Sequence, residues 1–281
     1  MIIVGLSNSY QLAKEVARRL NVPYVRADSR FSHDGEMHIN FGENVKRKKI
    51  FLFQSFYPNQ NNSLIEVLFA ANLAKELGAR GVNLVAPYLA YLREELRTDK
   101  FECVSVKNLG KILSNFVDSI LIVDPHLDNL NKYFSIPVHI ISSNDLIKHY
   151  IKKNYGDVII VGPDENSQKL VTSLGFKNVI LKKKRKDEFN VEFKKGYNLK
   201  DKKVVIVDDM IITGSTMLGS VKYLGLKNAD FITIHPVMKK EVLEELKKYG
   251  NIISCNTIDN ESNALDVSSL IAGKIKNEWN S

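Results

Sequence analysis

The sequence predicts an α/β protein with mainly parallel sheets flanked by helices, arranged as two successive units. Short apolar runs rich in β-branched residues alternate with amphipathic stretches along the whole chain, and this alternation is typical of parallel α/β folds. The rhythm restarts near residue 142, although no tight repeat and no Gly/Pro-rich linker marks the boundary. We therefore expect domains over residues 1–142 and 143–281, with the last helix able to pack on the N-terminal domain.

Elements of the first half follow from this periodicity. Helices are expected at residues 9–20, 63–77 and 104–116, and strands at residues 2–6, 50–54, 82–86 and 119–124. The first helix places Leu12, Val16 and Leu20 on one face. The second helix ends at Gly78, the position after a helix that glycine favours.

The second half repeats the pattern. Strands are expected at residues 138–141, 157–161, 179–183, 203–207, 231–234 and 252–255, and helices at residues 144–153, 165–174, 215–224, 240–249 and 268–276. The run at residues 203–207 is apolar after its first residue, which indicates a strand covered on both faces.

Composition limits the class of protein. The chain has 281 residues, of which 44% are hydrophobic and 26% charged, the balance of a globular rather than a disordered protein. No apolar run approaches the ~20 residues of a membrane span, so no membrane association is expected. The first residues carry no basic leader, and Cys103 and Cys255 cannot form a disulfide framework, so a cytoplasmic protein without a signal peptide is expected.

The net charge of +8 favours anionic partners. Lysines gather at residues 182–186, 194–195 and 200–203, which fits either an anion site or a solvated basic face. No basic stripe is interleaved with aromatic residues, so nucleic-acid binding is not expected.

The strongest chemical signal lies at residues 204–216. An apolar strand ends in Asp208 and Asp209, and a Thr-Gly-Ser-Thr loop beginning at Thr213 leads into a helix. Backbone N–H groups of such a loop and the positive end of the helix can hold a phosphate. The two carboxylates can accept hydrogen bonds from vicinal sugar hydroxyls or assist a divalent ion. The pattern favours a phosphorylated sugar over the alternative, an ordinary strand-to-helix turn with an Asp cap.

This segment resembles the phosphoribosyl-pyrophosphate loop of type I phosphoribosyltransferases. Further motifs, in the same order as in that family, resemble ribose-phosphate pyrophosphokinases, particularly the short archaeal-type sequences. They comprise an ATP loop at residues 31–36, the second-strand region at 44–55, a Pro-Tyr-x-x-Tyr-x-Arg segment at 87–95, a strand-end histidine at 123–126, a pyrophosphate loop at 162–164 and a catalytic flap at 183–185. The resemblance implies two tandem type I phosphoribosyltransferase-like domains.

The resemblance also implies a reaction, in which the 1-hydroxyl of ribose 5-phosphate attacks the β-phosphorus of Mg-ATP and gives PRPP and AMP. Lys183 and Arg185 would close over the transferring group as catalytic cations. The implied ribose 5-phosphate site consists of Arg185, Asp208, Asp209, Ile212, Thr213, Gly214, Ser215 and Thr216. The implied ATP site consists of Asp34, Gly35, Glu36, Arg93 and Glu94, and His126 and Asp164 would bind Mg²⁺. In this family the ATP loop often acts across a subunit interface, so a homodimer or larger homo-oligomer is expected.

Several of these residues also have simpler structural interpretations. His126 fits a surface histidine at a strand end, and Asp164 fits a cap for the following helix. Arg93 fits an exposed ion-pair ladder with Glu95 and Arg97.

The chain departs from the family pattern at several positions. Phe31 lies one residue too far from Asp34, and Glu94 stands where the family has Gln. Residues 165–167 replace a Gly-rich loop with Glu-Asn-Ser, so that Asn166 and Ser167 make close backbone approach to a phosphate harder. Ser215 replaces a second glycine, and Ile212 replaces a polar residue.

These departures affect the ATP and pyrophosphate sites more than the ribose-phosphate site, which leaves alternatives to an active synthetase. One is a catalytically impaired paralogue that binds ribose phosphate or nucleotide and regulates an active synthetase. Another is a phosphoribosyltransferase that uses PRPP, although that reaction needs neither the N-terminal Asp-Gly-Glu loop nor a second domain.

Overall fold

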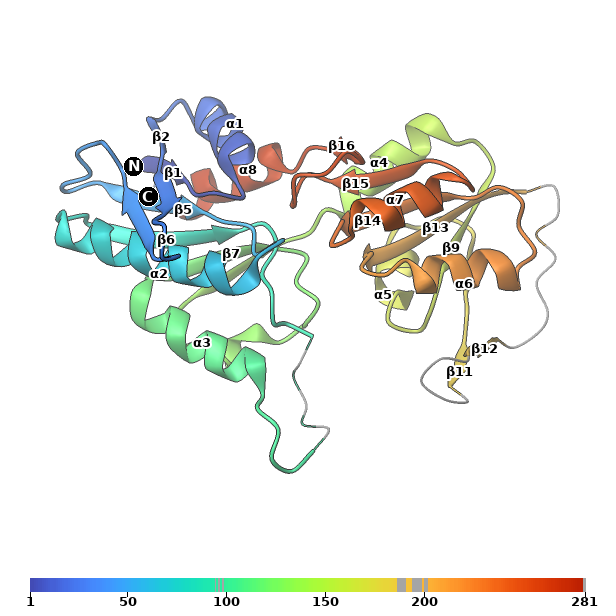
Figure 1. Ribbon diagram of the computed structural model, residues 1–281. Coiled ribbons are helices and arrows are strands. Elements are labelled where there is room, and N and C mark those ends of the chain that lie inside the picture. The colour runs from blue at the N-terminus through green and yellow to red at the C-terminus, as the bar shows by residue number, and fades with distance from the viewer. Residues whose placement is uncertain are drawn as a thin grey trace. The chain divides into compact units, whose positions relative to one another are not determined.

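The computed structural model describes residues 1–93, 95, 97, 99–185, 191–193, 199 and 202–279, with the backbone alone for residues 183–185 and 191–193. The chain divides into two compact units (Figure 1). The first unit comprises Met1–Ser142, Thr257–Asp259 and Val267–Ser281, and the second comprises Ser143–Asn256 and Asn260–Asp266. The C-terminal segment of the chain therefore returns to the first unit.

The first unit is built on a parallel sheet with the strand order β2-β1-β5-β6-β7-β8. Its strands are β1 (Ile2–Gly5), β2 (Tyr24–Arg26), β5 (Lys49–Phe53), β6 (Gly81–Ala86), β7 (Ser119–Val123) and β8 (Val138–Ile141). Its helices are α1 (Tyr10–Leu20), α2 (Gln60–Glu76), α3 (Ser105–Phe116) and α8 (Ser268–Trp279), with a short 3₁₀ turn at Leu130–Lys132. Figure 1 shows α1 and α8 together on one side of the strands and α2 and α3 on the other.

The second unit has a parallel sheet with the strand order β10-β9-β13-β14-β15-β16. Its strands are β9 (Val158–Gly162), β10 (Asn178–Ile180), β13 (Lys203–Met210), β14 (Asp230–His235), β15 (Ile252–Cys255) and β16 (Asn263–Leu265). Its helices are α4 (Asn144–Asn154), α5 (Gln168–Ser173), α6 (Ser215–Tyr223) and α7 (Lys240–Lys247). The core between this sheet and its helices includes Val204, Ile206, Met217, Phe231 and Leu246.

The two units repeat one order of elements. In each unit a β–α–β pair is followed by an antiparallel hairpin, and the chain then returns to the sheet on the other side of its first strand. The hairpins are β3 (Asp28–Phe31) with β4 (Met37–Asn40), and β11 (Lys183–Arg185) with β12 (Val191–Phe193). The hairpin that carries residues 34–36 is thus the topological counterpart of the hairpin that carries Lys183 and Arg185.

The predicted α/β class, with mainly parallel sheets flanked by helices, is confirmed. Some predicted elements were wrong in extent or were missed. The strand expected at residues 179–183 is instead β10, which ends at Ile180, and β11, which begins at Lys183. The helix expected from residue 165 begins at Gln168. Four further features were not predicted: β2, β12, β16 and the β3–β4 hairpin.

The end of α8 is held to the first unit by the single tryptophan of the chain. The indole Nε1–H of Trp279 donates to Oδ1 of Asn83 at 3.1 Å, and its ring meets the ring of Phe51 edge-on at 5.4 Å. Asn83 is buried in β6, where its Oδ1 also accepts a hydrogen bond from Ser119. None of the helices described here is long and apolar enough to cross a membrane.

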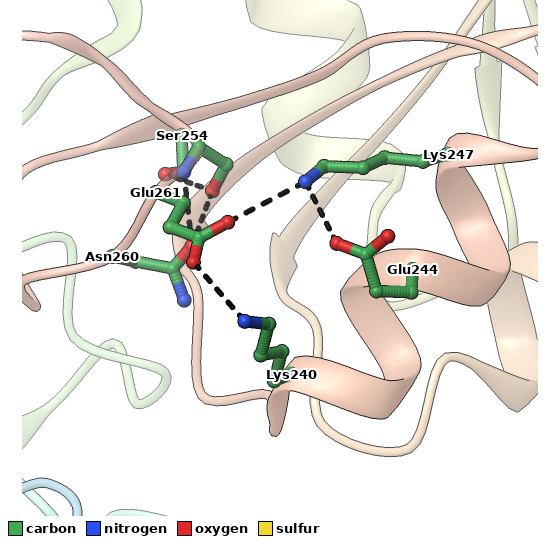
Figure 2. Close-up of polar contacts among 7 residues, drawn as sticks. Lys240, Glu244, Lys247, Ser254, Asn260 and Glu261 are labelled. Atoms are coloured by element: carbon green, nitrogen blue, oxygen red, sulfur yellow. Dashed lines mark hydrogen bonds and ion pairs between the residues drawn. The ribbon is translucent and has the colours of Figure 1, made fainter.

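In the second unit, a chain of exposed charges ties the loop before β16 to α7 (Figure 2). Glu261 pairs with Lys240 at 3.9 Å and with Lys247 at 3.5 Å, and Lys247 also pairs with Glu244 at 2.9 Å. Asn260 begins the same loop and accepts hydrogen bonds from Ser262. Because these charges are exposed and screened by water, they orient the loop more than they stabilise the fold.

Candidate active site

The candidate site of the second unit lies where the chain changes direction across the sheet. β9 and β13 are neighbours, but β9 leads through α5 to one side and β13 leads through α6 to the other. Ligands of open α/β sheets bind beyond the carboxyl ends of the strands at such a switch point. Asp164 follows β9, and Asp208 and Asp209 end β13, so the sheet brings these three predicted residues to one edge.

β13 carries its two acids at the end of a buried strand. Residues 204–207 are buried and residues 208–210 are half-buried. Asp208 lies opposite Thr233 of β14, and its Oδ1 accepts the backbone N–H of Asp209 at 3.1 Å. Because side chains alternate along a strand, the adjacent aspartates leave it in opposite directions. The strand end therefore presents carboxylates on both of its sides.

Gly214 shapes the turn from β13 into α6. Its φ of +72° lies in the left-handed region, and a Cβ at this position would meet Cγ1 of Val242 at 2.7 Å. The neighbouring hydroxyls of Thr213 and Ser215 are exposed and hydrogen-bond to each other at 2.8 Å. Ser215 and Thr216 open the helix, whose first N–H groups have no acceptor within the helix. This turn is suited to a phosphate group.

Ile212 connects the acids to this turn and is half-buried, whereas its neighbour Ile211 is buried in the core. The backbone N–H of Ile211 donates to the carbonyl of His235 at 3.2 Å. The beginning of the loop is thus anchored to β14, and further along it Thr213 and Ser215 are exposed.

The loop after β9 is closed on itself. Oδ1 of Asp164 accepts the backbone N–H groups of Asn166 at 3.1 Å and Ser167 at 3.3 Å. A Cβ at Gly162 would meet Oγ of Ser167 at 2.5 Å, so the turn packs tightly against the strand end. The N–H groups that a Gly-rich loop would offer to a phosphate are directed here at the carboxylate of Asp164. Asp164 caps this turn rather than the first residue of the helix.

The predicted ATP loop forms the tip of the β3–β4 hairpin in the first unit. Asp34, Gly35 and Glu36 are all exposed, and Gly35 has a φ of +90°. The hydroxyl of Ser32 donates to Oδ1 of Asp34, and the backbone N–H of Glu36 donates to the same oxygen at 3.3 Å. These hydrogen bonds lower the pKa of Asp34 below its ordinary value.

Two further predicted residues lie just after neighbouring strands of the first unit. Arg93 is exposed and comes after β6, and His126 is half-buried and comes after β7, which pairs with β6. Tyr91 and Asp124 adopt left-handed backbone with φ of +65° and +36°. Such conformations are uncommon outside glycine and gather at functional sites. Glu94 lies outside the described residues.

The predicted catalytic cations lie on the hairpin of the second unit. Lys183 and Arg185 are the first and last residues of β11, where they pair with Phe193 and Val191 of β12. Their side chains lie outside the part of the chain that the structure describes.

The described side chains can be compared with the ligands that a metal ion requires. Among the residues that the structure describes, no three His, Cys, Asp or Glu side chains are grouped to hold an ion. Mg²⁺ is usually held by one or two carboxylates together with substrate phosphates and water. The acids at the ends of β9 and β13 fit an ion carried by a phosphate substrate better than a closed protein site.

One polar residue that the sequence analysis passed over is Glu66 of α2. It is 2% exposed, and it accepts hydrogen bonds from Ser7, Ser29 and Gln54. No local sequence signal pointed to it, because its partners come from distant parts of the chain at residues 7, 29 and 54.

Comparisons with known proteins agree with this arrangement. Residues 1–116 match the family model described as the N-terminal domain of ribose phosphate pyrophosphokinase, and residues 130–271 match the phosphoribosyl transferase domain model. The chain is 31% identical to the ribose-phosphate pyrophosphokinase of Methanothermobacter thermautotrophicus, over 98% of this chain and 100% of that one. It is 30% identical to the Clostridium perfringens protein of the same name, over 92% and 86%.

A solved structure supports the same family. The crystal structure of phosphoribosylpyrophosphate synthetase from Mycobacterium smegmatis superimposes with a TM-score of 0.86 at 25% identity, covering 98% of this chain and 97% of that one. The motifs of the sequence had indicated the same family, and that expectation is confirmed. The chain, a transferase of diphosphoryl groups, therefore belongs to the ribose-phosphate pyrophosphokinase family.

Proposed function

We propose that the chain transfers the β,γ-diphosphoryl group of Mg-ATP to the 1-hydroxyl of ribose 5-phosphate, giving PRPP and AMP. One observation carries the proposal. At the switch point of its sheet, β13 presents two half-buried aspartates and then a Gly214-capped helix start. Carboxylates for sugar hydroxyls thus adjoin N–H donors for a phosphate. The names of the relatives support the same substrate.

The reaction requires the protein to position the two substrates and to stabilise the charge on the phosphate oxygens. The 1-hydroxyl oxygen forms a bond to the β-phosphorus while the bond from that phosphorus to the α,β-bridging oxygen breaks. AMP leaves with the bridging oxygen, and the hydroxyl proton passes to water. Such a transfer depends mainly on alignment and on stabilising the phosphate oxygens. We assign Asp208 and Asp209 to the ribose hydroxyls and residues 212–216 to the 5-phosphate.

Lys183 and Arg185 are assigned to the transferring diphosphoryl group. Their hairpin comes after β10, which pairs with β9, and β9 pairs with β13, so the hairpin leaves the sheet at the edge where the acids lie. The guanidinium of Arg185 can bind two phosphate oxygens at once, and it is also assigned to ribose 5-phosphate.

The nucleotide is assigned to the first unit. Asp34, Gly35 and Glu36 would bind the adenine end, and Arg93 with Glu94 would reach the phosphates. We further propose a cytoplasmic homodimer or larger homo-oligomer, because in this family the hairpin tip acts on a neighbouring subunit.

Mg²⁺ is the divalent ion that suits this chemistry, since it neutralises charge on phosphate oxygens when bound with ATP. His126 and Asp164 are the residues assigned to it. The carboxylate of Asp164 is already oriented by the N–H groups of Asn166 and Ser167, so it needs little rearrangement to meet the ion.

Three variants test the assignment of roles. Lys183→Ala should lower kcat by about 10²–10³ while the KM for ribose 5-phosphate stays unchanged, because its charge acts on the transition state. Asp209→Asn should raise that KM about tenfold by weakening hydrogen bonds to the sugar. Lys182→Ala removes an exposed neighbouring charge and serves as the matched control. AMP release at varied substrate concentrations gives all of these constants.

The outcomes separate the alternatives. An unchanged kcat in Lys183→Ala would remove the flap from the mechanism. A wild-type chain that makes no AMP, yet binds ribose 5-phosphate in a way that Asp209→Asn abolishes, would instead identify a regulatory paralogue.

A further inference from the structure

Glu66 is a buried carboxylate with a full set of donors. Its Oε1 accepts the backbone N–H of Ser7 at 2.9 Å and the hydroxyl of Ser29 at 2.5 Å. Its Oε2 accepts the hydroxyl of Ser7 and the side-chain amide of Gln54, both at 2.5 Å. Because a buried polar group is costly unless it is hydrogen-bonded, these donors allow the Glu66 side chain to lie inside the protein.

The donors come from the switch point of the first unit. Ser7 lies just after β1, and Gln54 lies just after β5, the neighbouring strand that leads the chain to the other side of the sheet. This place corresponds to the edge in the second unit where β9 and β13 end beside Asp164 and Asp208. In the second unit Asp208 and Asp209 are half-buried, and Thr213 and Ser215 of the following loop are exposed. In the first unit the residues just after β1 and β5 donate to a carboxylate supplied by α2.

The hydroxyl of Ser29 links the switch point of the first unit to the β3–β4 hairpin. Ser29 lies in β3, opposite Ile39 of β4, and the loop at residues 34–36 is the tip of the same hairpin. The side chain of Ser29 is half-buried, and its hydroxyl joins the hairpin to α2 through Glu66. The hydrogen bond therefore connects the sheet edge, the helix and the nucleotide loop.

We propose that Glu66 is a positioning residue for nucleotide binding. Its carboxylate fills the switch point of the first unit and, through Ser29, fixes the hairpin in the orientation in which residues 34–36 meet ATP. The inference rests on the proposed function, because it takes the hairpin tip as part of the ATP site. It predicts that loosening the Ser29 contact weakens ATP binding and leaves ribose 5-phosphate binding unaffected.

Ser29→Ala tests the contact with little risk to folding, since it removes one hydroxyl from a half-buried position. We expect the KM for ATP to rise about threefold to tenfold, the range for losing one hydrogen bond. The KM for ribose 5-phosphate should stay within about twofold. Ser29→Thr keeps the hydroxyl on a residue that suits a strand and should restore the KM for ATP.

Ser63→Ala is the matched control. It also removes a hydroxyl from the same polar region, where Ser63 contacts Asn8 and Asn59 but not the hairpin. Amide hydrogen exchange should quicken over residues 28–40 in Ser29→Ala and not in Ser63→Ala. If the hydroxyl had only a structural role, Ser29→Ala and Ser63→Ala would change hydrogen exchange alike. The KM for ATP and the KM for ribose 5-phosphate would then change by the same factor.

Equilibrium binding of an ATP analogue with a methylene group between its α- and β-phosphorus keeps the inference separate from the proposed function. If the wild type forms AMP and Ser29→Ala leaves the KM for ATP and the affinity for the analogue unchanged, the positioning role is wrong and the function stands. If the wild type forms no AMP but Ser29→Ala weakens analogue binding threefold to tenfold, the function is wrong and the positioning role stands. Equal effects of Ser29→Ala and Ser63→Ala overturn the positioning role in either case.

Discussion

At the residue scale, Gly214 is sterically constrained within the loop at residues 212–216, which we assign to the phosphate of ribose 5-phosphate. A side chain there would combine a φ of +72° with a 2.7 Å approach to Val242. We expect Gly214→Ala to displace the loop and to raise the KM for ribose 5-phosphate about tenfold or more, with the KM for ATP little changed.

Gly219 provides the control for this prediction. It lies within α6, and a Cβ there would meet no atom within 4 Å. Gly219→Ala should therefore keep both KM values, and it should stabilise the helix by about 0.5–1 kcal/mol. Steady-state kinetics on the two variants measures the difference, and equal KM values for ribose 5-phosphate would refute the role of the turn.

The lowered pKa of Asp230 predicts how the stability of the folded protein changes at low pH. Burial alone would raise its pKa, but hydrogen bonds from Lys203 at 2.8 Å, the Asn251 N–H at 2.7 Å and Tyr155 at 2.9 Å outweigh burial and lower the pKa. A carboxyl with a lowered folded pKa adds stability above its unfolded pKa, near 3.9, and this stability is lost as the pH falls through the folded value.

The urea midpoint of the wild type should therefore fall further between pH 6 and pH 3 than that of Asp230→Asn. The variant should also be less stable at pH 6, because Lys203 loses its partner. Asp157→Asn removes an exposed carboxylate that pairs with Lys177 and should change the pH dependence far less. Parallel midpoint curves for the wild type and Asp230→Asn would contradict this account.

At the residue scale, the sequence could predict the site residues that are contiguous in the chain. Asp208, Asp209 and the loop to Thr216 lie within one stretch, so their spacing alone predicts a sugar-phosphate site. The partners of Glu66 come from residues 7, 29 and 54, which only the folded sheet brings together. No local pattern encodes such a cluster.

At the scale of elements, apolar strands could be predicted and polar ones could not. The central strands β5 and β7 and the first half of β13 are mostly buried and contain apolar runs, and β6 is buried with one polar residue, Asn83. β3 has the sequence Asp-Ser-Arg-Phe and is largely exposed, so it carries neither an apolar run nor an alternating pattern. Its pairing with β4 is decided by the hairpin, not by burial.

The last helix allows a prediction of its own. Trp279→Ala removes the edge contact with Phe51 and the donor to Asn83, and we expect it to destabilise the first unit by about 2 kcal/mol. Trp279→Phe keeps one aromatic ring and loses the N–H and the second ring of the indole, so its effect should be smaller than that of Trp279→Ala. Hydrogen exchange should quicken in α1 and β5 but not in β13, which belongs to the second unit. Equal exchange in both units would refute local docking by α8.

At the scale of the whole molecule, the two units share one order of elements but carry different residues at their strand ends. The same strand order occurs in both units, yet only the second ends its switch-point strands in Asp164, Asp208 and a loop with exposed hydroxyls. The sequence shows no tight repeat because this topology requires matching apolar strands and not matching residues. The two units therefore differ in the residues at and after the carboxyl ends of these strands.

The central claim is that this chain itself moves a diphosphoryl group, and phosphorus NMR on the purified wild type with ATP, Mg²⁺ and ribose 5-phosphate tests it most directly. We predict that the ATP signals give way to AMP and to a pair of coupled diphosphate resonances attached to ribose, with ribose in place of ribose 5-phosphate giving no change. Formation of ADP with a singly phosphorylated C1, or ATP signals that persist at high enzyme concentration, would contradict the claim.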